Sequence, residues 1–284
     1  MSDVSIIIIN YNTFELTCTC IRSIVDFTKG VSYEIILVDN ASVDKMPEDF
    51  TAVFPNIILI KNRENVGFSK ANNIGIRRAS GDVILLLNSD TELKDDSISL
   101  AYQNLVERNA LKTVVVTGKL IYPDGRTQYQ CGRFPSISLQ LIELFRLQKL
   151  LSKEQRGSLL LGGFFNHERP VSPDWIWGTF FMFKKNILDY FPDKKLTETY
   201  FMYQEDLEWC FYVKKAGFKI YYDPAIKVIH HFSSSSRTQE LVTRKDLLLE
   251  NNYRDFLKRH YGIAYTGVFL ALLKINKKIH AMLG

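Results

Sequence analysis

Residues Val4–Asn10 read VSIIIIN, a continuous run of apolar, mostly β-branched side chains that ends on a polar one. A run of this kind is typical of a strand that is buried on both faces of a sheet. Helical spacing of apolar residues follows, and strand-like and helix-like segments then alternate as far as Ile121. This order predicts an α/β fold with a mostly parallel sheet and helices on both faces. The further strands expected in this half are Glu34–Asp39, Ile57–Lys61, Val83–Leu87 and Thr113–Ile121, and the helices include Met46–Phe54, Ser69–Ala79 and Ser97–Arg108.

The second half of the chain has a less regular pattern. Arg156–Pro173 combines Gly, Pro and His without a clear period, so we expect a mobile segment there. The polar run Ser233–Ser236 predicts a link between an α/β domain at residues 1–236 and a helical tail at residues 237–284. The other expected elements are a loop over Pro123–Pro135, helices over Leu139–Leu151 and Glu205–Ala216, and strands over Trp175–Phe183, Lys219–Tyr222 and Ile226–His230.

Charge is distributed unevenly along the chain. Hydrophobic residues make up 46% and charged residues 24%, which excludes a disordered chain and allows a sizeable core. Between Arg237 and Gly284, 9 Lys and Arg face 4 Asp and Glu, an excess that equals the net charge of +5 of the whole chain. A nucleic-acid-binding protein would spread its positive charge over the fold, so we expect no nucleic-acid partner.

The tail combines basic and apolar residues. Its apolar run Ile263–Leu273 is shorter than the about 20 residues that a membrane-spanning helix needs, and Lys274, Lys277 and Lys278 follow it. This composition fits a helix that lies in a membrane surface, and it fits equally a helix packed on the protein's own core or on a second subunit of a homo-oligomer. No basic segment precedes the first strand and the 4 cysteines lack metal-ligand spacing, so we expect a cytoplasmic protein with reduced thiols.

Polar side chains gather where the predicted parallel strands end, which is where sheets of this type bind ligands. Tyr11 can stack on a base, and Asp39 can accept the N3–H of a uracil or thymine ring. Gly67 allows a ligand to approach the backbone, and Lys70 stands near a helix start that favours phosphate. The same residue types are also typical of turns and helix caps, so this alternative stays open. Asn12, Asn65, Asn73 and Asn88 complete the candidate nucleotide-binding set.

Three further positions carry candidate chemistry. Asp90 follows a buried strand, where a carboxylate can hold Mg²⁺ or Mn²⁺ against a diphosphate. Glu205 and Asp206 begin a helix, where a carboxylate can serve as general base toward a hydroxyl group, and His230 ends a strand as a candidate metal ligand. Each also has a structural alternative: a helix cap for Asp90, favourable interaction with the helix dipole for the acidic pair, and simple packing for the histidine.

The segments that carry these residues occur in a characteristic order. They are Ser5–Asn12, Leu37–Ser42, Glu64–Ile76, Leu85–Thr91, Trp175–Lys185, Gln204–Gly217 and Val228–His231. In this order they closely resemble the inverting nucleotide-sugar glycosyltransferases of family 2, and most of all the rhamnosyltransferase-like branch. The resemblance covers roughly residues 3–236 and implies a Rossmann-like GT-A fold that transfers a sugar from a nucleotide-diphosphate donor to a hydroxyl group.

The resemblance implies a role for each matching position. Asn88-Ser89-Asp90 matches the metal-binding D-x-D motif with Asn in place of the first acid, which leaves the strictness of metal dependence open. Trp177 and Gly178 would lie beside the sugar and the acceptor, and Trp177 stands where relatives often have a small polar residue. Asp39 would bind a pyrimidine base in a pocket lined by Tyr11 and Asn12, Asp206 would be the catalytic base with Glu205 beside it, and His230 would help Asp90 to hold the metal.

The resemblance also implies the partners of the reaction. The donor would be a dTDP- or UDP-sugar carrying rhamnose or another hexose, bound with Mg²⁺ or Mn²⁺. The acceptor would be a glycan or a polyprenyl-linked glycan, which favours a peripheral location on the inner face of the cell membrane. Three alternatives are a sugar nucleotidyltransferase, a non-catalytic relative that binds nucleotide, and a membrane-surface scaffold. The absence of G-x-G-x-x-G and of G-x-x-x-x-G-K-[ST] removes the main support for a dinucleotide or P-loop site.

Overall fold

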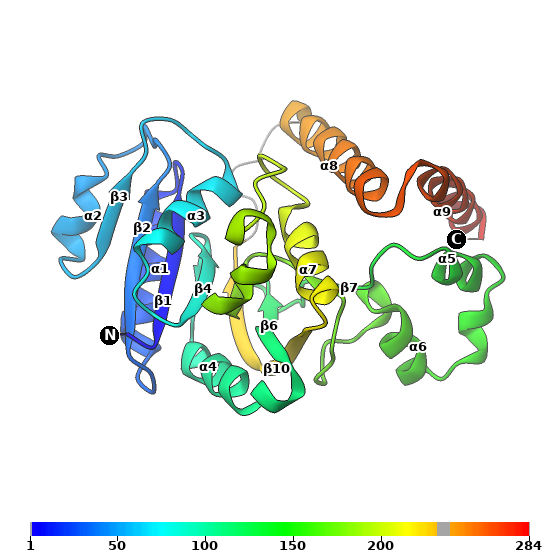
Figure 1. The fold of residues 1–284 in the computed structure, drawn as a ribbon, viewed down its shortest axis with the longest axis horizontal. Helices are drawn as coiled ribbons and strands as arrows, with labels where there is room; N and C mark the ends of the chain where they lie inside the picture. Colours follow the sequence, from blue (N-terminus) through cyan, green and yellow to red (C-terminus); the bar gives the residue numbers. More distant parts are fainter. Residues whose placement is uncertain (1, 232–238, 284) are drawn as a thin grey trace.

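The computed structural model describes residues 2–231 and 239–283 and is built around an eight-stranded mixed sheet (Figure 1). The strand order is β3-β2-β1-β4-β9-β6-β10-β5. β1–β4 are mutually parallel where they pair, β6 pairs parallel with β10, and β9 and β5 run antiparallel to their neighbours. The strands are β1 Val4–Asn10, β2 Tyr33–Asp39, β3 Ile58–Lys61, β4 Val83–Asn88, β5 Thr91–Glu92, β6 Thr113–Ile121, β9 Phe180–Lys184 and β10 Lys219–His230.

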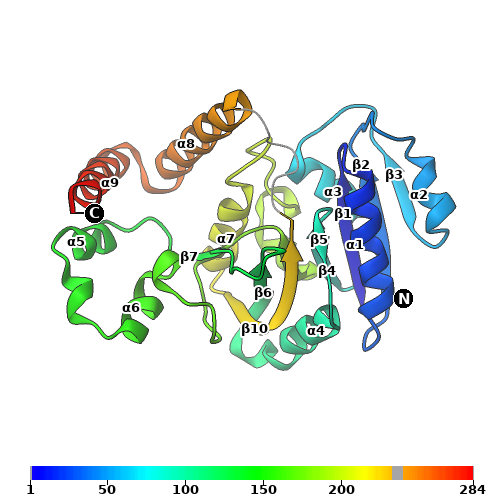
Figure 2. The same ribbon diagram turned by 180° about the vertical axis from the view of Figure 1, so that it is seen from behind.

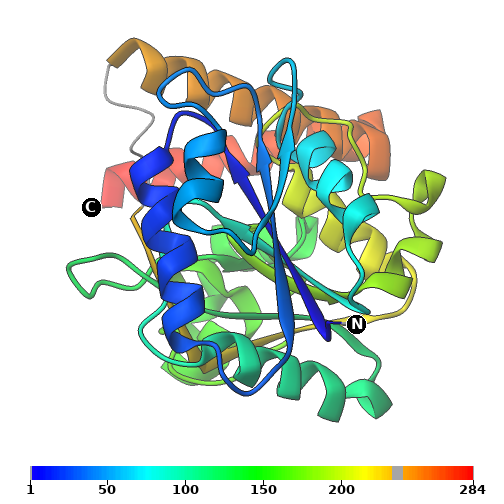
Figure 3. The ribbon, with the colours of Figure 1, turned by 90° about the vertical axis from the view of Figure 1, so that its left-hand side faces the viewer.

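The sheet has a hydrophobic core on each face. Alternate residues of β1 belong to different cores, with Ile7 in one and Ile6 and Ile8 in the other, and all three side chains are fully buried. The helices α1 (Phe14–Phe27) and α4 (Ser97–Glu107) cover one face, and α3 (Phe68–Arg78) and α7 (Glu205–Lys215) cover the other, while the short α2 (Glu48–Val53) follows β2. Figure 3 shows the blue helix α1 and the cyan helix α3 on opposite sides of the strands. The predicted mostly parallel sheet with helices on both faces is confirmed.

Register brings the ends of several strands to one edge of the sheet. Asn10 pairs with Asp39 across β1 and β2, and Asn88 lies one step from Asn10 on the other side. β9 begins at this same edge because it runs antiparallel to β4, with Leu87 opposite Phe180. β10 ends there too, and His230 pairs with Thr91 in β5. Segments far apart in the sequence therefore place polar side chains side by side.

Four predicted elements differ from the structure. The predicted strand Trp175–Phe183 is two strands, β8 (Trp175–Ile176) and β9, because β8 pairs instead with β7 (Cys131–Gly132) in a separate sheet. The predicted helix Leu139–Leu151 ends early, since α5 covers Ile137–Leu144 and Arg146 takes a left-handed φ of 58°. The two short strands predicted after Lys219 form the single strand β10, with a register shift between Asp223 and Lys227.

The segment expected to be mobile contains regular structure. α6 (Lys153–Leu160) begins with a capping box in which Ser152 and Gln155 satisfy each other's backbone N–H groups. The short η3 (Gly162–Phe164) follows it, and the side chain of Phe165 is buried in the core. The predicted linker Ser233–Ser236 lies outside the described residues.

The C-terminal helices α8 (Gln239–Tyr261) and α9 (Ile263–Leu283) lie against the rest of the protein. Phe256 of α8 is fully buried in a small core with Tyr200 and Leu207. Asn276 of α9 donates to the carbonyl of Gln140 in α5 at 2.9 Å, and Figures 1 and 2 both show α9 beside α5 at the end of the molecule opposite β3. Within the described residues these helices pack on the protein's own surface, one of the arrangements that the sequence left open.

Candidate active site

Asp39 lies at the end of β2 and is almost completely buried. Its carboxylate accepts hydrogen bonds from the Asn10 side chain at 2.8 Å and from the Ser42 backbone N–H at 3.1 Å. These bonds stabilise the turn after β2, as a helix-cap or turn residue would. An ionised carboxylate has about four acceptor positions, so it retains capacity for a further donor.

A hollow of about 400 Å³ opens beside Asp39. Tyr11 and Asn12 follow β1 nearby, where the Asn12 side chain accepts the Val43 N–H at 2.8 Å and the Tyr11 side chain is exposed. Two basic residues that sequence reasoning missed also line it: Lys61, which is ion-paired with Glu48 on the same wall, and Arg63. The hollow is lined by Asp39, Ala41, Ser42, Val43, Met46, Pro47, Glu48, Lys61, Asn62 and Arg63.

The loop before α3 is organised differently from the sequence prediction. Asn65 accepts from the Asn40 side chain at 2.7 Å and from the Gly67 N–H at 3.0 Å, so its carbonyl shapes the loop. Gly67 is needed for a close approach, but the approaching group is the Phe201 carbonyl of the protein itself, 2.6 Å from where a Cβ would lie. Lys70 is exposed in the first turn of α3 and is available to an incoming anion.

Asn73 makes hydrogen bonds within the protein. It is buried, its amide donates to the Leu196 carbonyl at 2.8 Å and to Glu198 at 2.9 Å, and its carbonyl accepts the Leu196 N–H at 3.1 Å. These bonds use both ends of the amide to hold the segment near Leu196 against α3. A contact between Asn73 and the donor stays a prediction, and the spacing of asparagines along the sequence did not reveal these partners, which lie far along the chain.

Asp90 and His230 meet at the edge of the sheet. Oδ1 of Asp90 lies 3.3 Å from Nε2 of the buried His230. On the other side of the ring, Nδ1 lies 2.7 Å from the Gln128 carbonyl oxygen, while the Gln128 amide donates to the His230 carbonyl at 2.8 Å. The second bond orients the amide so that Nδ1 carries a proton, which makes Nε2 the acceptor of the neutral ring. A proton or a cation between Nε2 of His230 and the Asp90 carboxylate then offsets the repulsion between these two acceptor atoms.

The residues present fit a divalent cation. Oδ1 of Asn88 is buried and accepts no hydrogen bond from the described residues, and the side chains of Asp90 and His230 face each other nearby. A carboxylate oxygen, an amide oxygen and an imidazole nitrogen suit Mn²⁺ or Mg²⁺. Residues 2–231 and 239–283 contain no group of three His, Cys, Asp or Glu side chains that could hold a metal alone. A cation here would therefore also need oxygen atoms from a bound diphosphate or from water to complete its coordination.

Glu205 and Asp206 open α7, and only Asp206 is partly exposed. Its Oδ2 accepts the Gly178 backbone N–H at 3.1 Å and its Oδ1 accepts the Leu207 N–H at 2.8 Å. Burial raises the pKa of Asp206 above the ordinary aspartate value, and the hydrogen bond from Gly178 opposes that rise. Burial, together with the charge of Asp206, raises the pKa of Glu205 further. Glu205 therefore keeps its proton at a pH where Asp206 is ionised.

The loop between β8 and β9 connects these groups. The Asn88 N–H donates to the Thr179 carbonyl at 3.0 Å, and the preceding Gly178 contacts Asp206. The Trp177 side chain is half-buried and packs against the core that includes Ile6 and Ile8, and the backbone N–H of Trp177 donates to the Gln130 carbonyl at 3.2 Å. The carboxylates predicted to bind metal and to act as base are thereby held beside one strand end.

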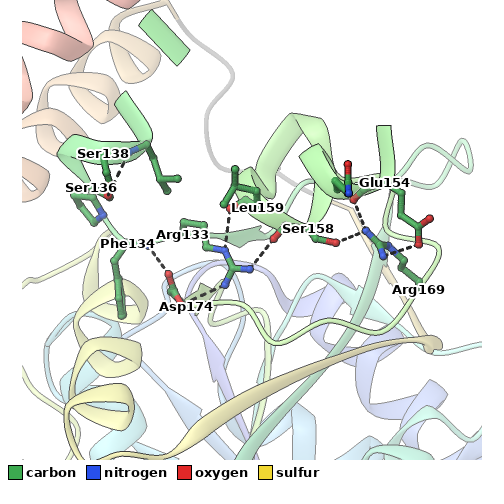
Figure 4. Close-up of a pocket in the computed structure, with 12 residues that line it drawn as sticks. Arg133, Phe134, Ser136, Ser138, Glu154, Ser158, Leu159, Arg169 and Asp174 are labelled. Atoms are coloured by element: carbon green, nitrogen blue, oxygen red, sulfur yellow. Dashed lines mark hydrogen bonds and ion pairs between the residues drawn. The ribbon is translucent and has the colours of Figure 1, made fainter. Parts of the chain in front are cut away.

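A larger hollow of about 780 Å³ lies between α5, α6 and β8 (Figure 4). Arg133 points toward α6, where its guanidinium donates to the Ser158 carbonyl at 2.7 Å, and it lies 3.4 Å from Asp174. Arg169 in turn donates to Glu154 at 2.9 Å. Both arginines are thus paired with acidic side chains. None of the site residues predicted from the sequence lines this hollow. Its lining residues are Arg133, Phe134, Pro135, Ser136, Ser138, Leu139, Glu154, Gln155, Ser158, Leu159, Arg169 and Asp174.

The sequence is similar to known sugar-transferring proteins. Residues 5–190 match the family described as Glycosyl transferase family 2. The chain is 24% identical over 241 residues to the low-salt glycan biosynthesis hexosyltransferase Agl10 of Haloferax volcanii, covering 81% of this chain and 68% of that one. It is 28% identical over 183 residues to the rhamnosyltransferase WbbL of Escherichia coli, covering 61% of this chain and 63% of that one. The aligned stretches span between 36% and 68% of the length of three curated relatives.

The fold is similar to that of a solved structure of GalNAc-T7 with UDP, GalNAc and Mn²⁺. The TM-score is 0.58 at 15% sequence identity, and the match covers 98% of this chain and 55% of that one. At this identity the likeness concerns the fold alone, and it confirms the expected GT-A arrangement of the mixed sheet.

Proposed function

The chain belongs to glycosyl transferase family 2, and we propose on this basis that it moves a hexose, with rhamnose the first candidate, from a nucleotide-diphosphate donor to a hydroxyl group of a glycan acceptor. The observation that carries the proposal is the Asp206 carboxylate, partly exposed and held by the Gly178 N–H. It lies at the same sheet edge as the Asp90–His230 pair and the hollow beside Asp39.

The base assignment follows from the different surroundings of the two acids. An acceptor hydroxyl must lose its proton as it attacks the anomeric carbon, and a carboxylate within hydrogen-bond reach can take that proton. Asp206 is partly exposed and held by two backbone N–H groups, whereas Glu205 is buried and its pKa is raised further than that of Asp206. We assign deprotonation to Asp206, on the face of the sugar opposite the leaving diphosphate, which inverts the anomeric centre.

The residues at the donor end of the site support the proposal that the donor carries a pyrimidine nucleotide. The hollow beside Asp39 has an acceptor carboxylate for a ring N–H, with Lys61 and Arg63 on its wall. Asp90, His230 and the orphaned Asn88 oxygen would hold a divalent cation. When bound, this cation supplies positive charge that offsets the charge of the diphosphate. We propose dTDP- or UDP-sugar as donor.

A membrane-bound acceptor is supported by one end of the molecule. Phe145 and Leu150, which follow α5, are 66% and 83% exposed, and Ile263 at the start of α9 is 79% exposed. Lys149 and Lys274 are also exposed on these segments. We call these residues, together with the exposed Leu147, Val268, Ile275, Lys277 and Lys278, the α5–α9 surface. Apolar side chains flanked by lysines are suited to an anionic lipid surface.

No helix among residues 2–231 and 239–283 is both long and apolar enough to span a membrane. On the strength of the exposed apolar and lysine side chains of the α5–α9 surface, we propose that the protein reaches a polyprenyl-linked acceptor at a membrane through this surface.

Product analysis tests the proposed reaction. Purified protein is incubated with dTDP- and UDP-hexoses, Mn²⁺ and a polyprenyl-diphosphate-linked sugar, and both the released nucleotide and the mass of the acceptor are measured. Acceptor mass increased by one hexose, with one nucleoside diphosphate released, is the expected result. Release of pyrophosphate in a parallel incubation with a nucleoside triphosphate and a hexose 1-phosphate would instead identify a nucleotidyltransferase. Nucleotide binding without any transfer would identify a non-catalytic relative.

A further inference from the structure

The turn before α7 has a backbone that its own residues do not favour. Tyr203 and Gln204 take left-handed φ values of 70° and 74°, and neither is glycine. No side chain caps the N-terminus of α7 at Gln204. Such conformations persist only where surrounding structure holds them, and they concentrate at functional sites. Asp206 follows this turn directly, so whatever holds the turn also sets the position of the carboxylate.

Asn252 of α8 holds this turn. Its side-chain amide donates to the carbonyls of Met202 and Tyr203, both at 3.0 Å, so one amide fixes two successive peptide groups. On the far side of the turn, the Phe68 N–H at the start of α3 donates to the Phe201 carbonyl at 2.9 Å. The turn is thus fastened between the C-terminal helix and the helix that begins at the donor side of the site.

Other residues of α8 hold α8 at a fixed distance from α7. Phe256, one helical turn after Asn252, is fully buried in the core it shares with Leu207 of α7. His260, one turn further, lies 3.1 Å from Glu208 of α7. Asp255 accepts the Tyr200 hydroxyl at 3.1 Å. These contacts place the Asn252 amide independently of the turn itself.

We propose that Asn252 is a positioning residue for sugar transfer, which acts through the turn at residues 201–204 to hold Asp206 at the Gly178 N–H. The inference rests on the proposed function, because it takes Asp206 as the base. It makes α8 a part of the catalytic apparatus. Carboxylate placement matters strongly, since a displacement of about 1 Å can lower a rate by about 100-fold.

The test replaces Asn252 with Asp, which has the same size but no N–H to donate. The chain offers a matched control in Asn276, whose amide makes two equivalent bonds, to the Gln140 carbonyl and side chain, both at 2.9 Å, in the contact between α9 and α5. We expect Asn252→Asp to lower kcat by about 10- to 100-fold with little change in the KM for donor. We also expect the acid limb of its pH–rate profile to move, because Asp206 would leave its hydrogen bonds. Asn276→Asp should keep the wild-type kcat and profile when all variants are assayed with a water-soluble glycan acceptor, which does not require docking through the α5–α9 surface.

Several outcomes would overturn the inference. Equal kcat in Asn252→Asp and Asn276→Asp would do so, as would a loss of activity that only follows the fraction of unfolded protein. Asn252→Ala, which removes the donors without adding charge, is measured in parallel; failure of both Asn252 variants to fold would make this residue a stability residue only. If neither wild type nor Asp206→Asn shows any transfer with any donor, the proposed function fails instead, and that result is separate from the role of Asn252.

Discussion

Nε2 of His230, the last residue of β10, lies 3.3 Å from Oδ1 of Asp90, which stands in the turn between β4 and β5. Gln128 fixes the opposite side of the imidazole through its bond to Nδ1. A carboxylate oxygen and an imidazole nitrogen at this separation can share a cation between them. Gln128 decides which ring nitrogen is available for this purpose.

Replacement of Gln128 with Leu should weaken metal binding. The variant removes the partner that keeps the proton on Nδ1, and loss of such supporting bonds typically costs about 10- to 100-fold in metal affinity. The concentration of Mn²⁺ that gives half-maximal transfer is the measurement. His231→Ala serves as control, because its side chain pairs with Glu92 instead, 3.5 Å away. Unchanged Mn²⁺ dependence in Gln128→Leu would show that this pair does not hold the metal.

Replacement of Asp206 with Asn should abolish the general base while leaving its shape. We expect turnover to fall by about 100- to 10,000-fold, because general-base catalysis typically contributes that much. Donor binding, measured by titration calorimetry, should stay near the wild-type value. Asp189→Asn, at an exposed acid that only approaches Lys194, is the matched control. Substantial turnover in Asp206→Asn would exclude Asp206 as the base.

The pH dependence follows from the raised pKa of Asp206. The base works only when ionised, and its folded-state pKa lies above the ordinary aspartate value, so activity should fall on acidification at a higher pH than for an exposed aspartate. Burial and the charge of Asp206 raise the pKa of Glu205 further than that of Asp206, so Glu205→Gln, which mimics the neutral acid, should keep most activity and leave the acid limb in place. A large shift of that limb in Glu205→Gln would mean that the two acids share the role of base.

The sequence predicts the donor half of the fold well because its signals are local. Buried strands such as β1 appear as continuous apolar runs, and the polar residues at their ends are adjacent in sequence to those runs. The roles of Asp90 and His230 were also predictable as candidates, since both stand at strand ends. Their mutual distance was not, because it depends on the pairing of β10 with β5.

Residues whose role depends on long-range contacts could not be found in this way. Gln128 lies in a segment that is correctly expected to be largely loop, and Asn252 lies in a tail whose composition suits a membrane equally well. Asn73 is a residue type that often contacts ligands, but in the structure its side-chain amide donates to the Leu196 carbonyl. The break between β8 and β9, which begins at Trp177, was not predicted either. It arises because β8 pairs with β7, and β7 has only two residues, Cys131 and Gly132, which give no sequence signal.

Nucleotide binding should depend on Asp39. A thermal-shift series with dTDP, UDP, GDP and CDP, with and without Mn²⁺, should show a rise of roughly 5 °C for a pyrimidine nucleotide at about 100 times its Kd. Asp39→Ala should lose this rise, and its ligand-free Tm should also fall because Asn10 and the Ser42 N–H lose an acceptor. Asp49→Ala, at an exposed acid in α2, should respond as wild type does. An equal rise in Asp39→Ala would place the base elsewhere.

Membrane binding should depend on the α5–α9 surface. Leu150 and Ile263 are among the most exposed apolar residues of the described chain, so Leu150→Ser combined with Ile263→Ser should alter binding without disturbing the core. Burying one large apolar side chain contributes roughly 1.5–3 kcal/mol, which predicts a fall of at least 10-fold in partitioning to vesicles that contain anionic lipid. Co-sedimentation with such vesicles is the measurement.

Two controls separate lipid binding from other uses of the same surface. Leu111→Ser changes an exposed leucine in η1 (Asn109–Leu111) next to β6, outside the α5–α9 surface, and should bind vesicles as wild type does. Gln in place of Lys274, Lys277 and Lys278 should weaken binding to anionic vesicles, with about 1 kcal/mol lost per lysine near the lipid surface, and should not affect neutral ones. If none of these variants changes sedimentation but the Leu150→Ser, Ile263→Ser double variant converts a dimer to a monomer, this surface joins two copies of the chain. The acceptor would then have to be presented without docking of the enzyme on the membrane through these helices.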